Sequence, residues 1–368
     1  SAAYPAKVIL NYSDENDHRR KLFDTCIRTL RLCMHEHYED CPWREQGLYA
    51  FDSRNQMLFG NVVFEAKEYA RACIDLLGQR FGDNCQINIC APTSTELFIP
   101  SFTLWWILEL KEYTELSGDL SLAKQYWEQV MRIVRNGEKS MKNSVAQPPN
   151  GKVFDGSADN AYFHHYEWSS GYEGMNQDLL ALYGSENFYE GMYPLIFLIV
   201  LEATRWIAEQ LGKHKESAEL FSLYRRSVAS YKQMFWDEDT GAFASFLYQG
   251  KRFHYGEYVQ SLALYSGICD EHQASVLYEK LLHGSELQEI TISYSIFKYE
   301  ALVKQNPACA GELYRSIEQK WSEMLYQGAT SFWETILGEA DFDGAGSLCH
   351  GWSALPIYFY YKYVKKQG

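Results

Sequence analysis

Apolar residues repeated at helical spacing constrain the fold of this chain more than any other feature. Leu22, Cys26 and Leu30 recur at intervals of four, which places them on one face of a helix. Similar stripes, separated by short polar breaks, predict helices over 17–38, 56–80, 101–116, 122–133, 176–183, 188–211, 214–235, 255–266, 271–283, 290–304, 308–327 and 350–364. Strand-like alternation is weak and confined to 86–90 and 242–248. The pattern therefore predicts an all-α fold.

The short breaks also indicate how the helices are arranged. Connections of roughly two to six residues make successive helices antiparallel neighbours. Such breaks stand at Gly212, Gly267, Gly284 and Asn306–Pro307. About six hairpins in succession predict a closed toroid, an (α/α)6 barrel, built as a single domain over 1–368. An open superhelical solenoid is the competing architecture, although no fixed repeat of about 34 or 40 residues is visible.

Charge and hydropathy exclude several classes of partner. The chain carries 34 Lys and Arg against 48 Asp and Glu, a net charge of −14, which argues against nucleic acid as a partner. The longest apolar run, 195–201, is far shorter than the roughly 20 residues that span a bilayer, so we expect no membrane segment. The first residues lack the basic and apolar regions of a signal peptide.

The cysteines and short motifs exclude further chemistry. The nine cysteines form an odd set without CxxC pairs, and we interpret most of them as small buried hydrophobic residues. Neither a disulfide-built fold nor a cysteine zinc site is expected from this spacing. The chain has no glycine-rich phosphate loop, GxSxG elbow or HExxH motif. We therefore expect neither a metal nor a cofactor.

Four long connections interrupt the helical pattern, at 39–55, 81–100, 137–175 and 329–349. Long irregular segments in a compact domain commonly serve a site. The first of them places carboxylates and arginines among aromatic residues: Asp40, Trp43, Arg44, Glu45, Tyr49, Phe51 and Asp52. An arginine can hold one carboxylate ionised while an aromatic wall desolvates another, which yields one base and one acid. A solvated loop with surface ion pairs is the alternative.

The last connection joins a carboxylate to aromatic residues. Glu334 directly follows Trp333, and His350 and Trp352 lie a short distance further on. Glycosidases use paired carboxylates for acid and base catalysis, and sugar rings stack on aromatic side chains beside them. The acidic turn at 341–344 also resembles a calcium loop, but the later ligands of an EF-hand are missing.

A third cluster lies in the longest connection, where Glu167 stands beside Trp168. The adjacent His164 and His165 would point apart on an extended chain. We therefore expect no joint metal site at these two histidines.

The motifs resemble those of the catalytic domain of glycoside hydrolase family 78, the α-L-rhamnosidases. The resemblance rests on Asp40–Gln46, Asp52, the Trp333–Glu334 step and Ser347–Ser353. It extends over nearly the whole chain, including 99–106. It implies an (α/α)6 barrel and a carbohydrate as partner.

The resemblance also implies roles for individual residues in an inverting hydrolysis of terminal α-L-rhamnosides. Glu45 matches the general acid and Glu334 the general base. The other matching positions are expected to contact the sugar: Asp40, Trp43, Arg44, Asp52, Glu167, Trp168, Trp333, His350 and Trp352.

Members of that family carry β-sandwich domains on both sides of the barrel, and we expect this chain to lack them. For an excised domain, an exposed apolar docking face is expected. The resemblance suggests a bacterial protein. The sequence leaves its compartment open between cytoplasm and periplasm, and cysteines that form no disulfide fit the reducing cytoplasm. Two alternatives stay open: another six-hairpin glycosidase, such as a glucosidase or an unsaturated uronyl hydrolase, and a non-catalytic carbohydrate-binding relic.

Overall fold

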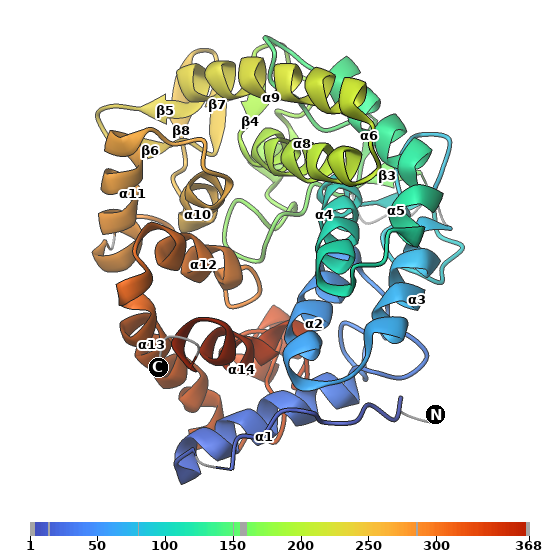
Figure 1. Cartoon of the computed structure of the whole chain (residues 1–368). Helices are drawn as coiled ribbons and strands as arrows, with labels where there is room; N and C mark the ends of the chain where they lie inside the picture. The colour runs from blue at the N-terminus through green and yellow to red at the C-terminus, as the bar shows by residue number, and fades with distance from the viewer. Residues whose placement is uncertain are drawn as a thin grey trace. The chain divides into compact units, whose positions relative to one another are not determined.

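The computed structural model describes residues 4–13, 15–79, 81–149, 151–154, 160–284 and 286–365. They form two compact units, each built mainly from helices (Figure 1). Unit 1 comprises the chain up to Leu77, Cys90–Pro92 and the chain from Asn306 onward. Unit 2 comprises Gly78–Ile89 and Thr93–Gln305.

In unit 1, α1 packs against α2, α13, α14 and the 3₁₀ helix η4. The α-helices of unit 1 are α1 (Asp17–Leu32), α2 (Ala50–Val63), α3 (Lys67–Gly78, which reaches the first residue of unit 2), α13 (Ala310–Tyr326) and α14 (Leu355–Phe359). The short elements are η1 (Pro307–Cys309), η2 (Gly338–Ala340), η3 (Phe342–Gly344), η4 (Gly351–Ala354) and η5 (Tyr360–Val364).

Helix α1 forms where the apolar stripe predicted it. The side chain of Asn16 caps its N-terminus by accepting a hydrogen bond from the backbone N–H of Arg19 at 2.9 Å. Leu22, Cys26 and Leu30 are fully buried, as the spacing requires. The helix ends at Leu32 rather than at residue 38, because the following segment turns back on itself.

Helix α2 begins earlier in the chain than the sequence predicts. The connection predicted over 39–55 ends early, since α2 begins at Ala50 and carries Asp52 in its first turn. Every residue from Ala50 to Gly60 is buried, including the polar run Asp52–Gln56. A helix buried on all sides has no amphipathic stripe, so periodicity cannot reveal where it begins. The single helix predicted over 56–80 is interrupted at 64–66 between α2 and α3.

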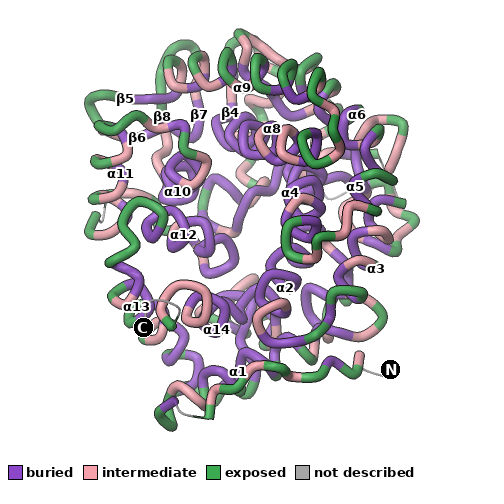
Figure 2. The backbone as a smooth tube through the Cα atoms, viewed as in Figure 1, coloured by how far each residue is buried: buried purple, intermediate pink, exposed green. Residues whose placement is uncertain are grey.

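The core of unit 2 is formed by α8, which packs against both α4 and α9, and by the pair α10 and α12. In Figure 2, α4 and α8 are largely purple, whereas α9 shows an exposed green side. The helices of unit 2 are α4 (Pro100–Ser117), α5 (Ser121–Gln125), α6 (Trp127–Lys139), α7 (Gln177–Leu180), α8 (Met192–Gln210), α9 (His214–Phe235), α10 (Glu257–Ser266), α11 (Glu271–His283) and α12 (Ser295–Gln305).

The longest apolar run of the chain lies inside α8, where Met192–Leu201 is buried without interruption. The run therefore forms protein core. Among the helices of the described residues, none combines the length and apolar character needed to cross a bilayer.

The strands are two or three residues long and belong to three small sheets, with β1–β3–β2 parallel and β4–β7–β8 and β5–β6 antiparallel. They are β1 (Leu97–Phe98), β2 (Lys152–Val153), β3 (Ala161–Tyr162), β4 (Phe188–Glu190), β5 (Trp236–Asp237), β6 (Ala242–Phe243), β7 (Phe246–Tyr248) and β8 (Lys251–Phe253). The alternation over 242–248 corresponds to β6 and β7. The segment 86–90 forms no strand, only a bridge from Ile87 to Phe81. The helix predicted from residue 188 starts at Met192, after β4.

Candidate active site

Two loops of unit 1 bring the acidic residues of distant sequence segments together. One loop joins α1 to α2, and the other leads from α13 to η4. The backbone N–H of Gly351 donates to the carbonyl of Asp40 at 2.9 Å, and that of His350 donates to the carbonyl of Phe332 at 2.8 Å. The first bond joins the second loop to the first loop. The other bond holds two parts of the second loop together.

Arg44 connects the two glutamates that the sequence singled out. Its Nη2 lies 3.3 Å from Oε1 of Glu45 and 3.2 Å from Oε2 of Glu334. Its Nη1 donates to the carbonyl of Ala345 at 2.9 Å. Because both carboxylates contact one nitrogen, these two oxygens can lie no farther apart than the sum of the two distances. That upper limit only reaches the start of the roughly 6.5–9.5 Å range of inverting glycosidases, so this contact alone does not favour inversion over the roughly 5–5.5 Å of retaining enzymes.

The two glutamates occupy different environments. Glu334 is only 2% exposed, and its Oε2 accepts a hydrogen bond from the backbone N–H of Ser347 at 3.0 Å. Burial raises the pKa of Glu334, while the Ser347 N–H and the Arg44 charge oppose the rise. The side chain of Glu45 is 40% exposed. One carboxylate is therefore buried and the other is exposed to solvent.

Asp40 is buried, at 2% exposure. Its Oδ1 accepts a hydrogen bond from the backbone N–H of Gly47 at 2.9 Å. Burial, assisted by the charge of Glu45, raises the pKa of Asp40 to about 7. Gly47 is required in this turn, since a Cβ there would lie 2.7 Å from the ring of Tyr49.

Asp52 and His350 place polar atoms in the same buried cluster. Nδ1 of His350 lies 3.8 Å from Oδ1 of Asp52, and Nε2 lies 3.8 Å from Oδ2 of Asp40. These separations exceed a hydrogen bond. His350 Nδ1 and Asp52 Oδ1 have no hydrogen-bond partner among the described residues. Because a buried polar atom without a partner is costly, the pair is suited to binding the hydroxyls of a ligand.

Burial sets the charge of this cluster. It holds the pKa of His350 well below its usual range, and the charge of Arg44 acts in the same direction. The pKa of Asp52 is raised well above its usual range by burial and by the charges of Asp40 and Glu45. His350 is therefore neutral at pH 7, with one ring nitrogen that donates and one that accepts.

Trp333 and Trp352 are buried and position the polar groups. The ring of Trp352 stacks on that of His350 with centroids 3.7 Å apart, and its Nε1 donates to the carbonyl of Glu334 at 3.0 Å. Trp333 is 8% exposed, and the hydroxyl of Ser353 donates to its carbonyl at 2.5 Å. Trp43, which directly precedes Arg44, is 88% exposed. Of the three tryptophans, Trp43 presents an open face to solvent.

Glu167 and Trp168 belong to unit 2. Glu167 is fully buried, with Oε1 accepting a hydrogen bond from the hydroxyl of Ser169 and Oε2 accepting one from that of Thr291 at 2.6 Å. Burial raises the pKa of Glu167. The ring of Trp168 lies 4.5 Å from that of His165. The predicted contact of Glu167 and Trp168 with the sugar stays a prediction.

Gln56 is a site residue that the sequence analysis did not select. Its Nε2 donates to the carbonyl of Glu39 at 2.9 Å, and a Cβ on Gly351 would lie 2.3 Å from its Cδ. Gln56 thus packs directly under the loop that carries His350. The signal in the sequence was the unbroken polar run Asp52–Gln56, which is unusual for a helix that turns out to be buried.

The described residues contain no group of three or more His, Cys, Asp or Glu side chains that could hold a metal ion. At the acidic turn, Oδ1 of Asp341 accepts a hydrogen bond from the backbone N–H of Phe342 at 3.0 Å. Asp341 therefore caps the turn η3.

The chain is similar to a known protein family and to solved structures of several enzymes. A family model described as the bacterial alpha-L-rhamnosidase six-hairpin glycosidase domain matches residues 12–364. A rhamnosidase of family GH78 from a Bacillus species is similar with 22% identity and a TM-score of 0.81, covering 98% of this chain and 36% of that one. A rhamnosidase from Klebsiella oxytoca with rhamnose bound is similar with 19% identity and a TM-score of 0.77, covering 99% of this chain and 66% of that one.

The same fold also occurs in another hydrolase. A GH63 mannosylglycerate hydrolase from Thermus thermophilus is similar with 11% identity and a TM-score of 0.64, covering 93% of this chain and all of that one. A search of curated proteins found no match. Together the family model and the structural similarities confirm the predicted six-hairpin (α/α)6 fold. The chain spans 36% and 66% of the lengths of the two rhamnosidases.

Proposed function

Because this chain belongs to the bacterial α-L-rhamnosidase six-hairpin glycosidase family, we propose that it hydrolyses terminal α-L-rhamnosides with inversion. The observation that carries this proposal is the pair of carboxylates, Glu45 and Glu334, which both contact Nη2 of Arg44. One is exposed and one is enclosed, which suits the two different tasks of an acid and a base.

Glu45 acts as the general acid in this proposal. Its carboxyl lies on the open side of the site, from which a leaving group departs into solvent. The hydroxyl of Tyr49 hydrogen-bonds to Glu45 and limits its rotation. The carboxylic acid donates its proton to the glycosidic oxygen as the bond to the anomeric carbon breaks.

Glu334 acts as the general base. The Ser347 N–H and Arg44 orient its carboxylate and keep it ionised. Burial raises the pKa of Glu334, which makes its carboxylate a stronger proton acceptor. The carboxylate takes a proton from the water that attacks the anomeric carbon opposite the leaving group.

The buried cluster beside the glutamates binds the sugar. Asp40 and Asp52 supply carboxylate oxygens, and neutral His350 supplies both a donor and an acceptor. Because burial raises the pKa of both aspartates, their protonated forms can donate a hydrogen bond to a sugar hydroxyl as well as accept one. Trp43 lies next to Arg44 on the exposed side, so we assign it to the leaving group.

Two alternatives differ in substrate or in activity. The GH63 mannosylglycerate hydrolase shares the fold, which favours a second candidate function as a six-hairpin glycosidase for a different sugar. A carbohydrate-binding relic without activity would not need a buried carboxylate oriented by an arginine and a backbone N–H. The site geometry therefore favours an enzyme.

A panel of 4-nitrophenyl glycosides tests the proposal. The purified chain is expected to release nitrophenol from the α-L-rhamnoside and not from the α-glucoside or α-mannoside. The double variant Glu45→Gln, Glu334→Gln serves as the inactive control. Release from another glycoside, or from an unsaturated uronyl disaccharide, would select a different six-hairpin glycosidase. Calorimetric binding of rhamnose without any hydrolysis would select the relic.

A further inference from the structure

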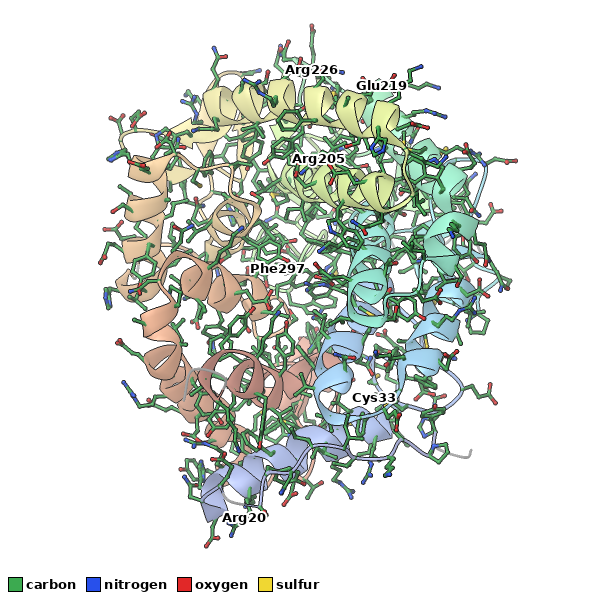
Figure 3. All side chains as sticks on the ribbon, viewed as in Figure 1. Arg20, Cys33, Arg205, Glu219, Arg226 and Phe297 are labelled. Atoms are coloured by element: carbon green, nitrogen blue, oxygen red, sulfur yellow. The ribbon has the colours of Figure 1, made fainter. Side chains whose placement is uncertain are left out.

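Two thiols meet beside the candidate site in unit 1. Cys33 lies at the C-terminal end of α1, where Figure 3 labels it, and Cys349 directly precedes His350. Their Sγ atoms are 3.9 Å apart, and both cysteines are free. A disulfide requires a separation of about 2.05 Å, so a combined shift of roughly 2 Å would bond them.

The two thiols differ in access and in acidity. Cys33 is fully buried, and burial raises its pKa well above the usual range. Cys349 is partly exposed, and its hydrogen bond with Cys33 holds its pKa below the usual range, with the Ser331 hydroxyl and the Arg28 charge acting in the same direction. Cys349, the more accessible of the two thiols, thus has the greater thiolate character, which favours reaction with an oxidant.

Cys41 and Cys269 lack this combination. Burial raises the pKa of Cys41 to about 11 and that of Cys269 to about 12. Both are therefore thiols at pH 7 and react slowly. A reactive thiol with a second thiol at contact distance is the usual arrangement of a reversible redox site.

We propose that Cys33 and Cys349 form a redox modification site that hydrogen peroxide converts into a disulfide. The Cys349 thiolate attacks one peroxide oxygen, the O–O bond breaks, and hydroxide leaves to give a sulfenic acid. The sulfur of Cys33 then attacks that of Cys349, and the S–O bond breaks. The departing hydroxide takes the proton of Cys33 and leaves as water. Two thiols and one peroxide thus give one disulfide and two waters.

Oxidation is expected to disturb the site. Cys349 is covalently linked to His350, whose ring lies 3.8 Å from both Asp40 and Asp52. Sγ of Cys33 also lies 3.7 Å from the carbonyl oxygen of Asp40, so its S–H can donate there instead, and a disulfide removes that donor. Drawing Cys349 toward Cys33 therefore displaces the groups assigned to the sugar. This consequence for turnover rests on the proposed function, whereas formation of the disulfide does not.

Peptide mapping of the oxidised chain tests the modification directly. The full chain is treated with hydrogen peroxide, its remaining thiols are alkylated in denaturant, and the digest is analysed by mass spectrometry. We expect a peptide cross-linked through Cys33 and Cys349, two fewer alkylated cysteines, and recovery of both with dithiothreitol. The measurement needs no enzyme activity, so a failure of the proposed function leaves it intact.

Three variants separate this site from general oxidation. Cys33→Ser should leave Cys349 without a partner, so peroxide drives it to the sulfinic acid. Cys349→Ser should give no cross-link, and Cys269→Ser should behave like the wild type. If rhamnosidase activity is present, peroxide should lower it several-fold in the wild type, reversibly with dithiothreitol, and not in Cys349→Ser. Complete alkylation of all cysteines after peroxide, or pairing of Cys349 with Cys41, would overturn the proposal.

Discussion

One nitrogen of Arg44, Nη2, contacts both carboxylate oxygens of Glu334, at 3.4 and 3.2 Å. The guanidinium charge opposes the effect of burial on the pKa of Glu334. In the proposed mechanism, this contact keeps the general base ionised at the pH of turnover.

Replacing Arg44 by Ala should therefore affect both rate and pH dependence. We expect kcat/KM to fall at least about tenfold, since hydrogen bonds to charged groups contribute about 1.5–3 kcal/mol. Loss of the positive charge raises the pKa of Glu334 further, so the acidic limb of the kcat/KM profile should move to higher pH. Arg205→Ala, in unit 2, is the control. An unchanged acidic limb would show that Arg44 does not influence the pKa of the general base.

The variant Glu45→Gln tests the general acid through the leaving group. Removal of general acid catalysis costs typically about 10²–10⁴-fold in rate. We expect that loss with alkyl rhamnosides, whose leaving oxygen needs a proton, and a much smaller loss with 2,4-dinitrophenyl rhamnoside. Glu36→Gln, at an exposed position in the same loop, is the matched control. Equal losses on both substrates would contradict the acid role.

The variant Glu334→Gln tests the general base through the nucleophile. Water attack then loses its proton acceptor, so turnover should fall by a similar factor for good and poor leaving groups. Added azide attacks without a base and should restore part of the rate, with β-L-rhamnosyl azide as the product. If azide neither raises the rate nor appears in the product, Glu334 does not activate the nucleophile.

The variant Trp43→Ala tests the leaving-group side of the site. An aromatic pair contributes about 0.5–1.5 kcal/mol beyond burial, so KM for aryl rhamnosides should rise roughly threefold to tenfold. KM for methyl rhamnoside and the melting temperature should not change, because Trp43 is 88% exposed. A uniform rise in KM for both substrates would instead place Trp43 at the rhamnose ring.

Glu190 in unit 2 should make stability depend on pH. It is buried, accepts hydrogen bonds from the hydroxyls of Tyr166 and Tyr183, and burial raises its pKa from 4.5 to about 7. The contribution of protonated Glu190 to the free energy of unfolding is fully present below pH 4.5. It is lost as the pH rises through 7. The loss is on the order of 3 kcal/mol. We expect Glu190→Gln to flatten this part of the stability profile.

Chemical unfolding between pH 4.5 and 7.5 measures this contribution. Glu238→Gln, an exposed glutamate in the same unit, is the control and should follow the wild type. A Glu190→Gln variant that keeps the full pH dependence would assign the effect to another group.

The amphipathic helices were predictable because their apolar stripes face one core. Helix α9 has the predicted bounds, His214–Phe235, and Gly267 ends α10 with a φ of 74°, which favours glycine. Helix α2 lacks such a stripe, so its start and the helical setting of Asp52 could not be read from periodicity. Helix α2 is stabilised by burial within the tertiary structure, and a periodicity analysis of the sequence cannot detect such burial.

The candidate site was predictable in its composition and not in its geometry. Clustered carboxylates and the family resemblance selected Asp40, Glu45 and Glu334. No local pattern predicts the ion pair between Arg44 and Glu334, which are 290 residues apart. The same holds for Glu167, whose hydrogen bond from Thr291 spans 124 residues. Such contacts follow from the way the loops pack.

Proton NMR during the first minutes of hydrolysis tests the central claim most directly. An inverting enzyme with Glu45 as acid and Glu334 as base releases the β anomer of L-rhamnose first from an α-L-rhamnoside, before mutarotation forms the α anomer. We predict that the β signal appears first. An initial α signal would indicate retention and contradict the proposed roles of the two glutamates.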